Sequence, residues 1–216
     1  MKLEIPDAAQ NAATFWAVFL GAFLAAAAGL AASQVEAFFQ RRERERAAAL
    51  LFGEIFSTLQ VLLKLSDEVR AVGDPYGPIT MRMLRAARRE LDVYDRNRET
   101  LYDLRDAPLR VRIHNLVLRI TMPLDGLIDS SADVAAARAM AEDVDLKPAQ
   151  REEAARALAQ LQERRDQGFE FTMSMEAAIG PLVEGLGRIA RHDFVASADA
   201  ARASAPTAPR RSAVKG

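Results

Sequence analysis

The first long feature of the chain is an apolar run without a polar face. Residues Thr14 to Ser33 read TFWAVFLGAFLAAAAGLAAS and include no charged side chain. As a helix this run would rise about 30 Å, which is the thickness of the hydrocarbon core of a bilayer. A surface helix of a soluble protein would show a polar face, which this run lacks. The pattern therefore predicts a transmembrane helix over residues 14–39, with a buried alanine-rich core helix as the alternative.

The charges on the two sides of this run are asymmetric. Acidic Glu4 and Asp7 precede it, whereas a cluster of four arginines follows: Arg41, Arg42, Arg44 and Arg46. Arginines beside a span favour the cytoplasmic side and attract anionic lipid headgroups. We therefore expect residues 1–13 outside the cell and the chain from residue 40 onward in the cytoplasm. A cleaved signal peptide, with a cut after Ala31, is the alternative, but the acidic start of the chain argues against it.

Small side chains recur every four residues within the predicted span. Gly21, Ala25, Gly29 and Ser33 share one helix face. Such a face lets a second helix backbone approach closely in a membrane. The pattern predicts that the span associates with another copy, although a span rich in alanine also produces this spacing by chance.

Beyond the arginines the apolar positions continue at helical spacing as far as Val72. One stripe holds Leu51, Ile55, Leu62, Leu65 and Val69, and Phe52, Phe56, Leu59 and Leu63 widen it. No proline separates this segment from the span, so the pattern predicts one long helix from membrane to cytoplasm, weakest at the Arg/Glu cluster and at Gly53. The segment Gly73–Pro78 combines two glycines and two prolines and predicts a turn.

The rest of the chain predicts further amphipathic helices. A second helix from Thr80 carries the stripe Leu84, Ala87, Leu91 and Tyr94, and a third carries Leu109, Ile113, Leu116, Ile120, Leu124 and Leu127. Asp106 suits the N-cap of the third helix. We expect Pro123 to kink or break that helix, and a separate short alanine-rich helix to follow.

A fourth long helix is predicted from Pro148 to His192. Its heptad-like seam indicates coiled-coil packing, and Pro181 should bend it. Residues 195–216 are rich in Ala, Ser and Pro and are predicted to be a disordered tail. The fold class expected from these patterns is all-α: an N-terminal transmembrane helix that continues into an antiparallel helical bundle over residues 40–194.

Composition and charge exclude several classes of function. A net charge of -1 provides no overall field for nucleic acid, so we expect no nucleic-acid partner. The absence of cysteine excludes disulfides, thiolate metal sites and cysteine nucleophiles.

The histidines and carboxylates of the chain lack the spacing expected of a catalytic or metal-binding site. Neither His114 nor His192 has a glutamate three residues before it, so the carboxylate–histidine pair of di-iron bundles is missing. The carboxylates alternate with arginines, as on solvated helix faces. Arg82, Arg85, Arg88 and Arg89 are interpreted as such a face, with an acidic partner or anionic headgroups as the alternative. We therefore expect no catalytic residue, no metal and no cofactor.

Three segments carry a resemblance to a class of proteins: RRERERAAALLFGEI (Arg41–Ile55), LDVYDRNRETLYDL (Leu91–Leu104) and RIHNLVLRI (Arg112–Ile120). The chain resembles uncharacterised bacterial single-pass membrane proteins with a short cytoplasmic helical domain. The resemblance implies a location in the bacterial inner membrane and no particular site residues. The leading interpretation is a membrane-anchored scaffold that binds a protein partner or itself. A sensory or signalling element and a membrane-bound enzyme with an unrecognised carboxylate site are the alternatives.

Overall fold

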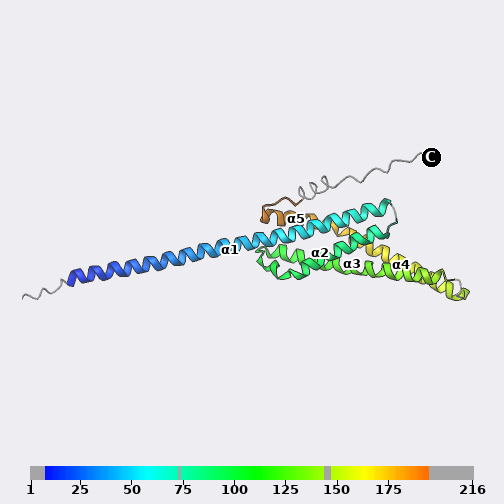
Figure 1. Ribbon diagram of the computed structural model, residues 1–216, viewed down its shortest axis with the longest axis horizontal. Helices are drawn as coiled ribbons and strands as arrows, with labels where there is room; N and C mark the ends of the chain where they lie inside the picture. Colours follow the sequence, from blue (N-terminus) through cyan, green and yellow to red (C-terminus); the bar gives the residue numbers. More distant parts are fainter. Residues whose placement is uncertain (1–7, 73, 144–146, 195–216) are drawn as a thin grey trace, which may run out of the picture. The chain divides into compact units, whose positions relative to one another are not determined.

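The regular structure of this chain is helical. The computed structural model describes residues 8–72, 74–143 and 147–194, and those ranges contain helices and no strand (Figure 1). The helices are α1 (Ala8–Val72), α2 (Pro78–Arg96), η1 (Arg98–Asp103), α3 (Ala107–Ala141), α4 (Pro148–Ser174) and α5 (Glu176–Ala190). The all-α prediction is confirmed. The predicted tail, 195–216, lies outside the described residues.

The contacts divide the chain into two units, residues 1–44 and residues 45–216. The first unit contributes the beginning of α1, and the second contains the rest of α1 together with the other helices. This division falls five residues after the end of the predicted span at residue 39, within the cluster of arginines.

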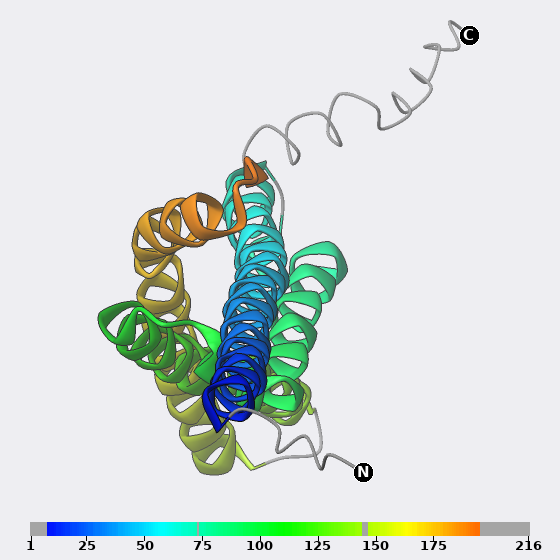
Figure 2. The same cartoon turned by 90° about the vertical axis from the view of Figure 1, so that its left-hand side faces the viewer.

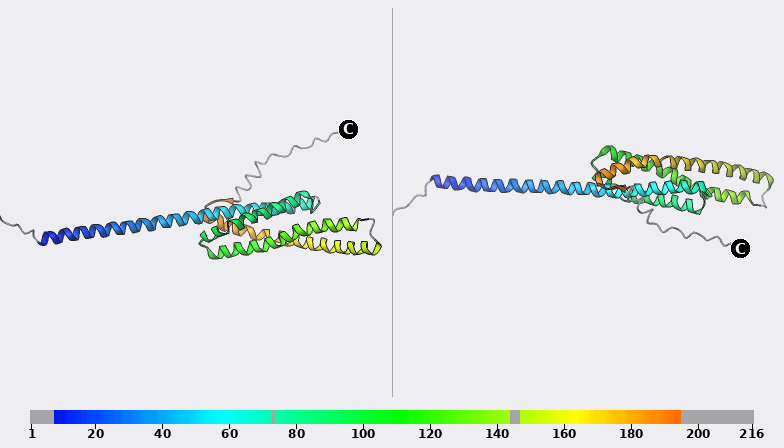
Figure 3. Two further views of the ribbon diagram at one scale, coloured as in Figure 1. Left: turned by 60° about the horizontal axis from the view of Figure 1, so that its bottom comes forward. Right: turned by 90° about the horizontal axis from the view of Figure 1, so that it is seen from above.

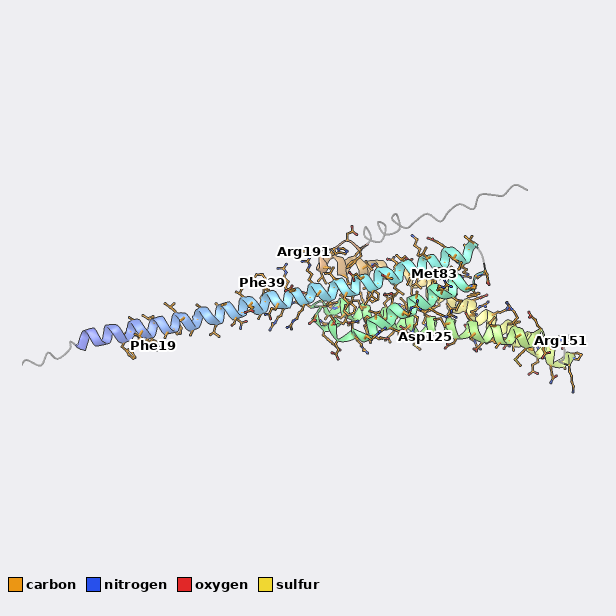
Figure 4. All side chains as sticks on the ribbon, viewed as in Figure 1. Phe19, Phe39, Met83, Asp125, Arg151 and Arg191 are labelled. Carbon is orange, nitrogen blue, oxygen red and sulfur yellow. The ribbon has the colours of Figure 1, made fainter. Side chains whose placement is uncertain are left out.

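The second unit is a helical bundle around one apolar core. Its helices run antiparallel in chain order, from the 45–72 part of α1 through α2, α3 and α4 (Figure 1). Figure 2 shows the same helices end-on. The predicted apolar stripes of α2 and α3 are buried, and Tyr94 packs its ring 5.6 Å from that of Phe52 and 6.2 Å from that of Phe56. On the side of α3, the Arg88 guanidinium of α2 holds Asp125 of α3 at 2.6 Å, and Figure 4 labels this aspartate.

The buried face of α1 is only partly the predicted one. The flanking set, Phe52, Phe56, Leu59 and Leu63, is fully buried, whereas Leu51 and Leu62 of the predicted stripe are half-buried. The stripe is therefore centred on the phenylalanine side, because two large rings fill more of the space beside Tyr94 than leucine does.

Pro123 does not break α3, which runs through it without interruption. The break is therefore wrong, and the kink, the other outcome expected at Pro123, stays a prediction. Proline removes one helical hydrogen bond and crowds the carbonyl four residues earlier. On either side of it, however, Ile120 and Leu124 are fully buried, and Leu127 is 1% exposed. Burial of these side chains outweighs the local penalty, and the predicted separate alanine-rich helix is the continuation of α3 to Ala141.

The single fourth helix was predicted wrongly, because the structure has two helices that are separated at Met175. The bend at Pro181 stays a prediction. Just before the break, the Thr172 hydroxyl donates to Gly168 O at 2.8 Å and the Ser174 hydroxyl donates to Phe171 O at 2.7 Å. Hydroxyls that bond to carbonyls of the preceding turn compete with the helical ladder. The same bonds from Ser66 in α1 and Ser131 in α3 leave those helices continuous, so they do not by themselves end α4. Pro181 lies inside α5. Coiled-coil packing of the heptad-like seam stays a prediction.

Near the start of the second unit, a phenylalanine ring lies against a glycine. Gly53 of α1 is buried, and a Cβ atom placed on it would lie 2.1 Å from Cζ of Phe194, whose side chain is 4% exposed. Any other residue at position 53 would occupy the space of this ring. Gly53, which looked like a weak point of the helix, is instead a packing position.

The α3–α4 hairpin extends past the turn between α1 and α2 (Figure 3). Most of its side chains between residues 131 and 160 are exposed, and Met140 is 61% exposed. Arg151 marks this end in Figure 4. The hairpin is therefore the least covered part of the second unit.

Candidate functional site

The first candidate site is the exposed apolar segment of α1, residues 15–35. No charged residue interrupts the chain between Asp7 and Glu36. The large side chains on this segment are unpacked, with Trp16 59% and Phe23 64% exposed, and Phe19 stands away from the helix in Figure 4. Among the described residues this is the one helix long and apolar enough to cross a membrane. A contiguous apolar surface of this size marks a site of contact with membrane or protein.

The predicted stripe of small residues lies open on this segment. Cβ atoms placed on Gly21 and Gly29 would meet nothing within 4 Å, and Ala25 is exposed. The Ser33 hydroxyl donates to Leu30 O of its own helix at 2.9 Å. The four positions are therefore available for close approach of another helix.

The four predicted juxtamembrane arginines fall into two groups. Arg41, Arg42 and Arg44 are exposed residues of the first unit. Arg46 belongs to the second unit, where its Nε donates to Ala190 O at 3.0 Å. This bond satisfies a carbonyl at the C-terminus of α5, where the helix dipole favours a positive charge. Arg46 thus has a packing contact that its place in the sequence did not indicate.

A second candidate site is built around Tyr76, in the turn that connects α1 to α2. The Tyr76 hydroxyl donates to Asp166 Oδ1 at 2.5 Å, and its backbone N–H donates to Asp74 Oδ1 at 3.1 Å. The Arg165 guanidinium carbon lies 3.5 Å from the centre of the Tyr76 ring. Burial, followed by the hydrogen bond to Asp166 and its charge, raises the pKa of Tyr76 to about 12. The phenol therefore stays neutral throughout the physiological range.

The end of α1 packs beside this tyrosine. The Arg70 guanidinium lies 4.4 Å from the centre of the Phe169 ring and pairs with Glu170 at 2.5 Å. Burial alone would lower the pKa of Arg70, but the hydrogen bond and charge of Glu170 outweigh it and raise the pKa. The Phe169 ring meets the Tyr76 ring edge-on at 5.9 Å. These contacts hold α1, the turn and α4 together.

A cavity of about 570 Å³ opens beside Tyr76, and we call it the arginine cavity. Its lining includes Arg85 of α2, Arg138 of α3 and Arg165 of α4. The sequence placed Arg85 with its neighbours on one solvated face, but the structure separates them, because Arg88 is engaged by Asp92 and Asp125. Arg138 and Arg165 lie on other helices, so no local sequence pattern could have grouped them with Arg85.

The remaining candidate chemistry stays dispersed in the described ranges. His114 is half-buried on α3, and the His192 ring lies against that of Phe194, with 4.7 Å between the ring centres. No group of three His, Asp or Glu side chains is placed to hold a metal ion in that part of the chain. The buried hydroxyls without a partner there belong to Thr80, Tyr94 and Thr121, three residues on different turns of the bundle. The described residues thus offer an apolar segment and a cationic cavity, and no assembled acid–base pair.

Comparisons with protein families, with curated proteins and with solved structures find no match to this chain. The resemblance to bacterial single-pass membrane proteins stays a prediction from the sequence.

Proposed function

We propose that this protein is a single-pass protein of a bacterial inner membrane, and that its cytoplasmic bundle acts by binding a protein partner or a second copy. The observation that carries this proposal is the apolar segment, whose large side chains are exposed along its length. Each large apolar side chain moved out of water contributes about 1.5–3 kcal/mol. A bilayer covers all sides of the helix at once, whereas a single protein groove covers one face.

The bundle supports an interaction role rather than a catalytic one. Its interior is filled by aromatic and aliphatic side chains, with Phe52, Phe56 and Tyr94 at the centre. Several of its carboxylates pair with arginine, as Asp92 and Asp125 do with Arg88, and none of the described carboxylates is fully buried. An anchor that confines such a bundle to one surface raises its effective concentration toward partners on the same surface.

Membrane insertion is tested by flotation and alkaline extraction of the full chain expressed in bacteria. We expect the protein to float with lipid and to resist extraction. The double change Phe19→Asp and Leu24→Asp should release it, because each aspartate costs about 2.5–3.5 kcal/mol at the centre of a span. Val72→Asp is the matched control, since Val72 is 90% exposed on the same helix but outside the apolar segment. Recovery of the unchanged protein in the soluble fraction would refute the proposal.

Orientation is tested with reporter fusions at Gly216. The charges of Arg41, Arg42 and Arg44 favour a cytoplasmic position for the residues that follow the span. We expect a reporter that works in the cytoplasm to be active there. Activity of an exported reporter alone would reverse the orientation.

Self-association is tested by cross-linking in membranes. Gly29→Ile adds bulk to the stripe of small residues without making the span more polar, so insertion should persist while association falls. Ala27→Ile is the matched control, because position 27 lies on the opposite side of the helix. Equal cross-linking of the two variants and the unchanged chain would exclude association through the stripe.

A further inference from the structure

We propose that the arginine cavity binds a small phosphate-bearing solute through Arg85, Arg138 and Arg165. The three side chains come from α2, α3 and α4 and line the same volume of about 570 Å³. A volume of this size falls within the range of small-molecule sites. Binding of this kind lies in the second unit alone and does not depend on membrane insertion.

Three arginines and two aspartates line the cavity, so its lining carries one positive charge in excess, and the carboxylate of Asp166 pairs with Arg165 rather than with Arg85 or Arg138. Both aspartates of the lining, Asp74 and Asp166, accept hydrogen bonds from Tyr76. Arg85 and Arg138 form no ion pair with any other described residue, and both are exposed toward solvent. The cavity therefore has two guanidinium groups free to meet an anion.

The third guanidinium, that of Arg165, is already fixed in place. Its side chain is 11% exposed, its Nε is buried without a hydrogen-bond partner in the described chain, and Asp166 Oδ1 is 3.6 Å away. Stacking on the Tyr76 ring restrains the guanidinium plane. A buried donor without an acceptor is costly, and an anion held in the cavity by Arg85 and Arg138 would supply negative charge beside it. Because Arg165 is immobilised before binding, less side-chain entropy is lost on binding.

The positions of the three arginines on three different helices favour a phosphate ligand over a carboxylate ligand. Terminal phosphate oxygens point in three directions, so three donors from different helices can each meet one of them. A carboxylate has two oxygens in one plane, which one bidentate arginine already satisfies.

The position of the cavity within the unit favours a dissolved ligand over a lipid headgroup. The cavity is beside the turn that follows Val72, whereas the unit begins at Glu45. The α1 residues between these points rise about 40 Å at ~1.5 Å per residue. The chain would leave a membrane at the Glu45 end, far from this turn along the helix.

The test is isothermal titration calorimetry of the full chain in a micelle of neutral detergent. Inorganic phosphate and glycerol phosphate are the probes, succinate is the carboxylate comparison, and sodium chloride keeps the ionic strength constant. We expect saturable binding of both phosphates and at least tenfold weaker binding of succinate. Equal binding of succinate would overturn the assignment to phosphate. Binding to vesicles of anionic lipid without binding of either soluble phosphate would overturn the assignment to a dissolved ligand.

Matched substitutions distinguish the cavity from general surface charge. Arg85→Gln and Arg138→Gln each remove one exposed guanidinium from the lining and should weaken phosphate binding at least about tenfold, since each removes a charge-assisted hydrogen bond. Arg82→Gln and Arg156→Gln are the controls, because both residues are exposed on α2 and α4 outside the lining. Equal loss in all four variants, or no loss in the first two, would refute the proposal. Far-ultraviolet circular dichroism of each variant confirms that the bundle is folded.

Discussion

The contact of Phe194 with Gly53 predicts that the usual effect of a helical glycine-to-alanine change is reversed at this position. Alanine is favoured over glycine inside a helix by about 1 kcal/mol. At position 53, however, the new methyl group would lie 2.1 Å from the Phe194 ring. No such pair of carbon atoms can coexist, so the ring must leave its place.

The size of the effect follows from the burial of that ring. Phe194 is 4% exposed, and exposing a buried phenylalanine costs about 1.5–3 kcal/mol. The gain in helix propensity offsets about 1 kcal/mol of this. Gly53→Ala should therefore lower the free energy of unfolding by about 0.5–2 kcal/mol. In a chain that already carries Phe194→Ala, the same change should raise it by about 1 kcal/mol.

The assay is urea unfolding of the full chain in neutral detergent, followed by circular dichroism, for the two single variants and the double variant. The difference between the two effects of Gly53→Ala isolates the contact with Phe194. A stabilising Gly53→Ala in the unchanged background, or an equal effect in both backgrounds, would show that the Phe194 ring does not pack against Gly53.

Three further outcomes follow from the bundle. The pKa of Tyr76 is about 12 in the folded chain and 10.0 as the reference value. As the pH rises, the unfolded chain therefore loses the phenolic proton before the folded chain does. The free energy of unfolding is unchanged below pH 10 and falls between pH 10 and about 12. Unfolding measured across that range should show a smaller loss in Tyr76→Phe, and an identical loss would contradict the assignment. Leu63→Ala should lower the free energy of unfolding by about 2–5 kcal/mol, and Leu62→Ala by clearly less, because Leu62 is only half-buried. Equal losses in urea titrations would show that Leu63 is not on the buried face of α1. Tyr94→Phe should cost nothing and can gain about 1 kcal/mol, since the Tyr94 hydroxyl is buried without a partner among the described residues; a clear loss on thermal unfolding would reveal a partner for it.

The sequence predicts the helices well because their signals are local. The end of α1 at Val72, the N-cap at Asp106 and the start of α4 at Pro148 all agree with the structure. Asp106 Oδ1 accepts from Leu109 N at 2.9 Å, as an N-cap should. Each of these signals depends on residues within about one turn of the boundary.

The errors arise where distant packing decides the outcome. Pro123 has the local character of a helix breaker, and only the burial of its neighbours against other helices keeps α3 intact. The buried face of α1 differs from the predicted stripe because Tyr94, more than thirty residues later, packs against Phe52 and Phe56. The arginine cavity escaped prediction for the same reason, since Arg85, Arg138 and Arg165 meet only after three helices have packed.

The first part of α3 is buried against other helices and its last part is exposed, so the two parts of this one helix differ in the free energy of local unfolding. Before Pro123 its inward side chains are locked in the core, as Ile113 is; beyond Ser131 few are covered, and Met140 is 61% exposed. Segments with little buried apolar surface open at a lower free energy than the core. Amide protons near Ile113 should therefore exchange with deuterium only when the whole bundle unfolds, whereas those near Met140 exchange through local fraying of the hairpin. The transition between the two exchange regimes lies inside a helix, so a protease can remove the end of the hairpin while the core of the bundle remains folded.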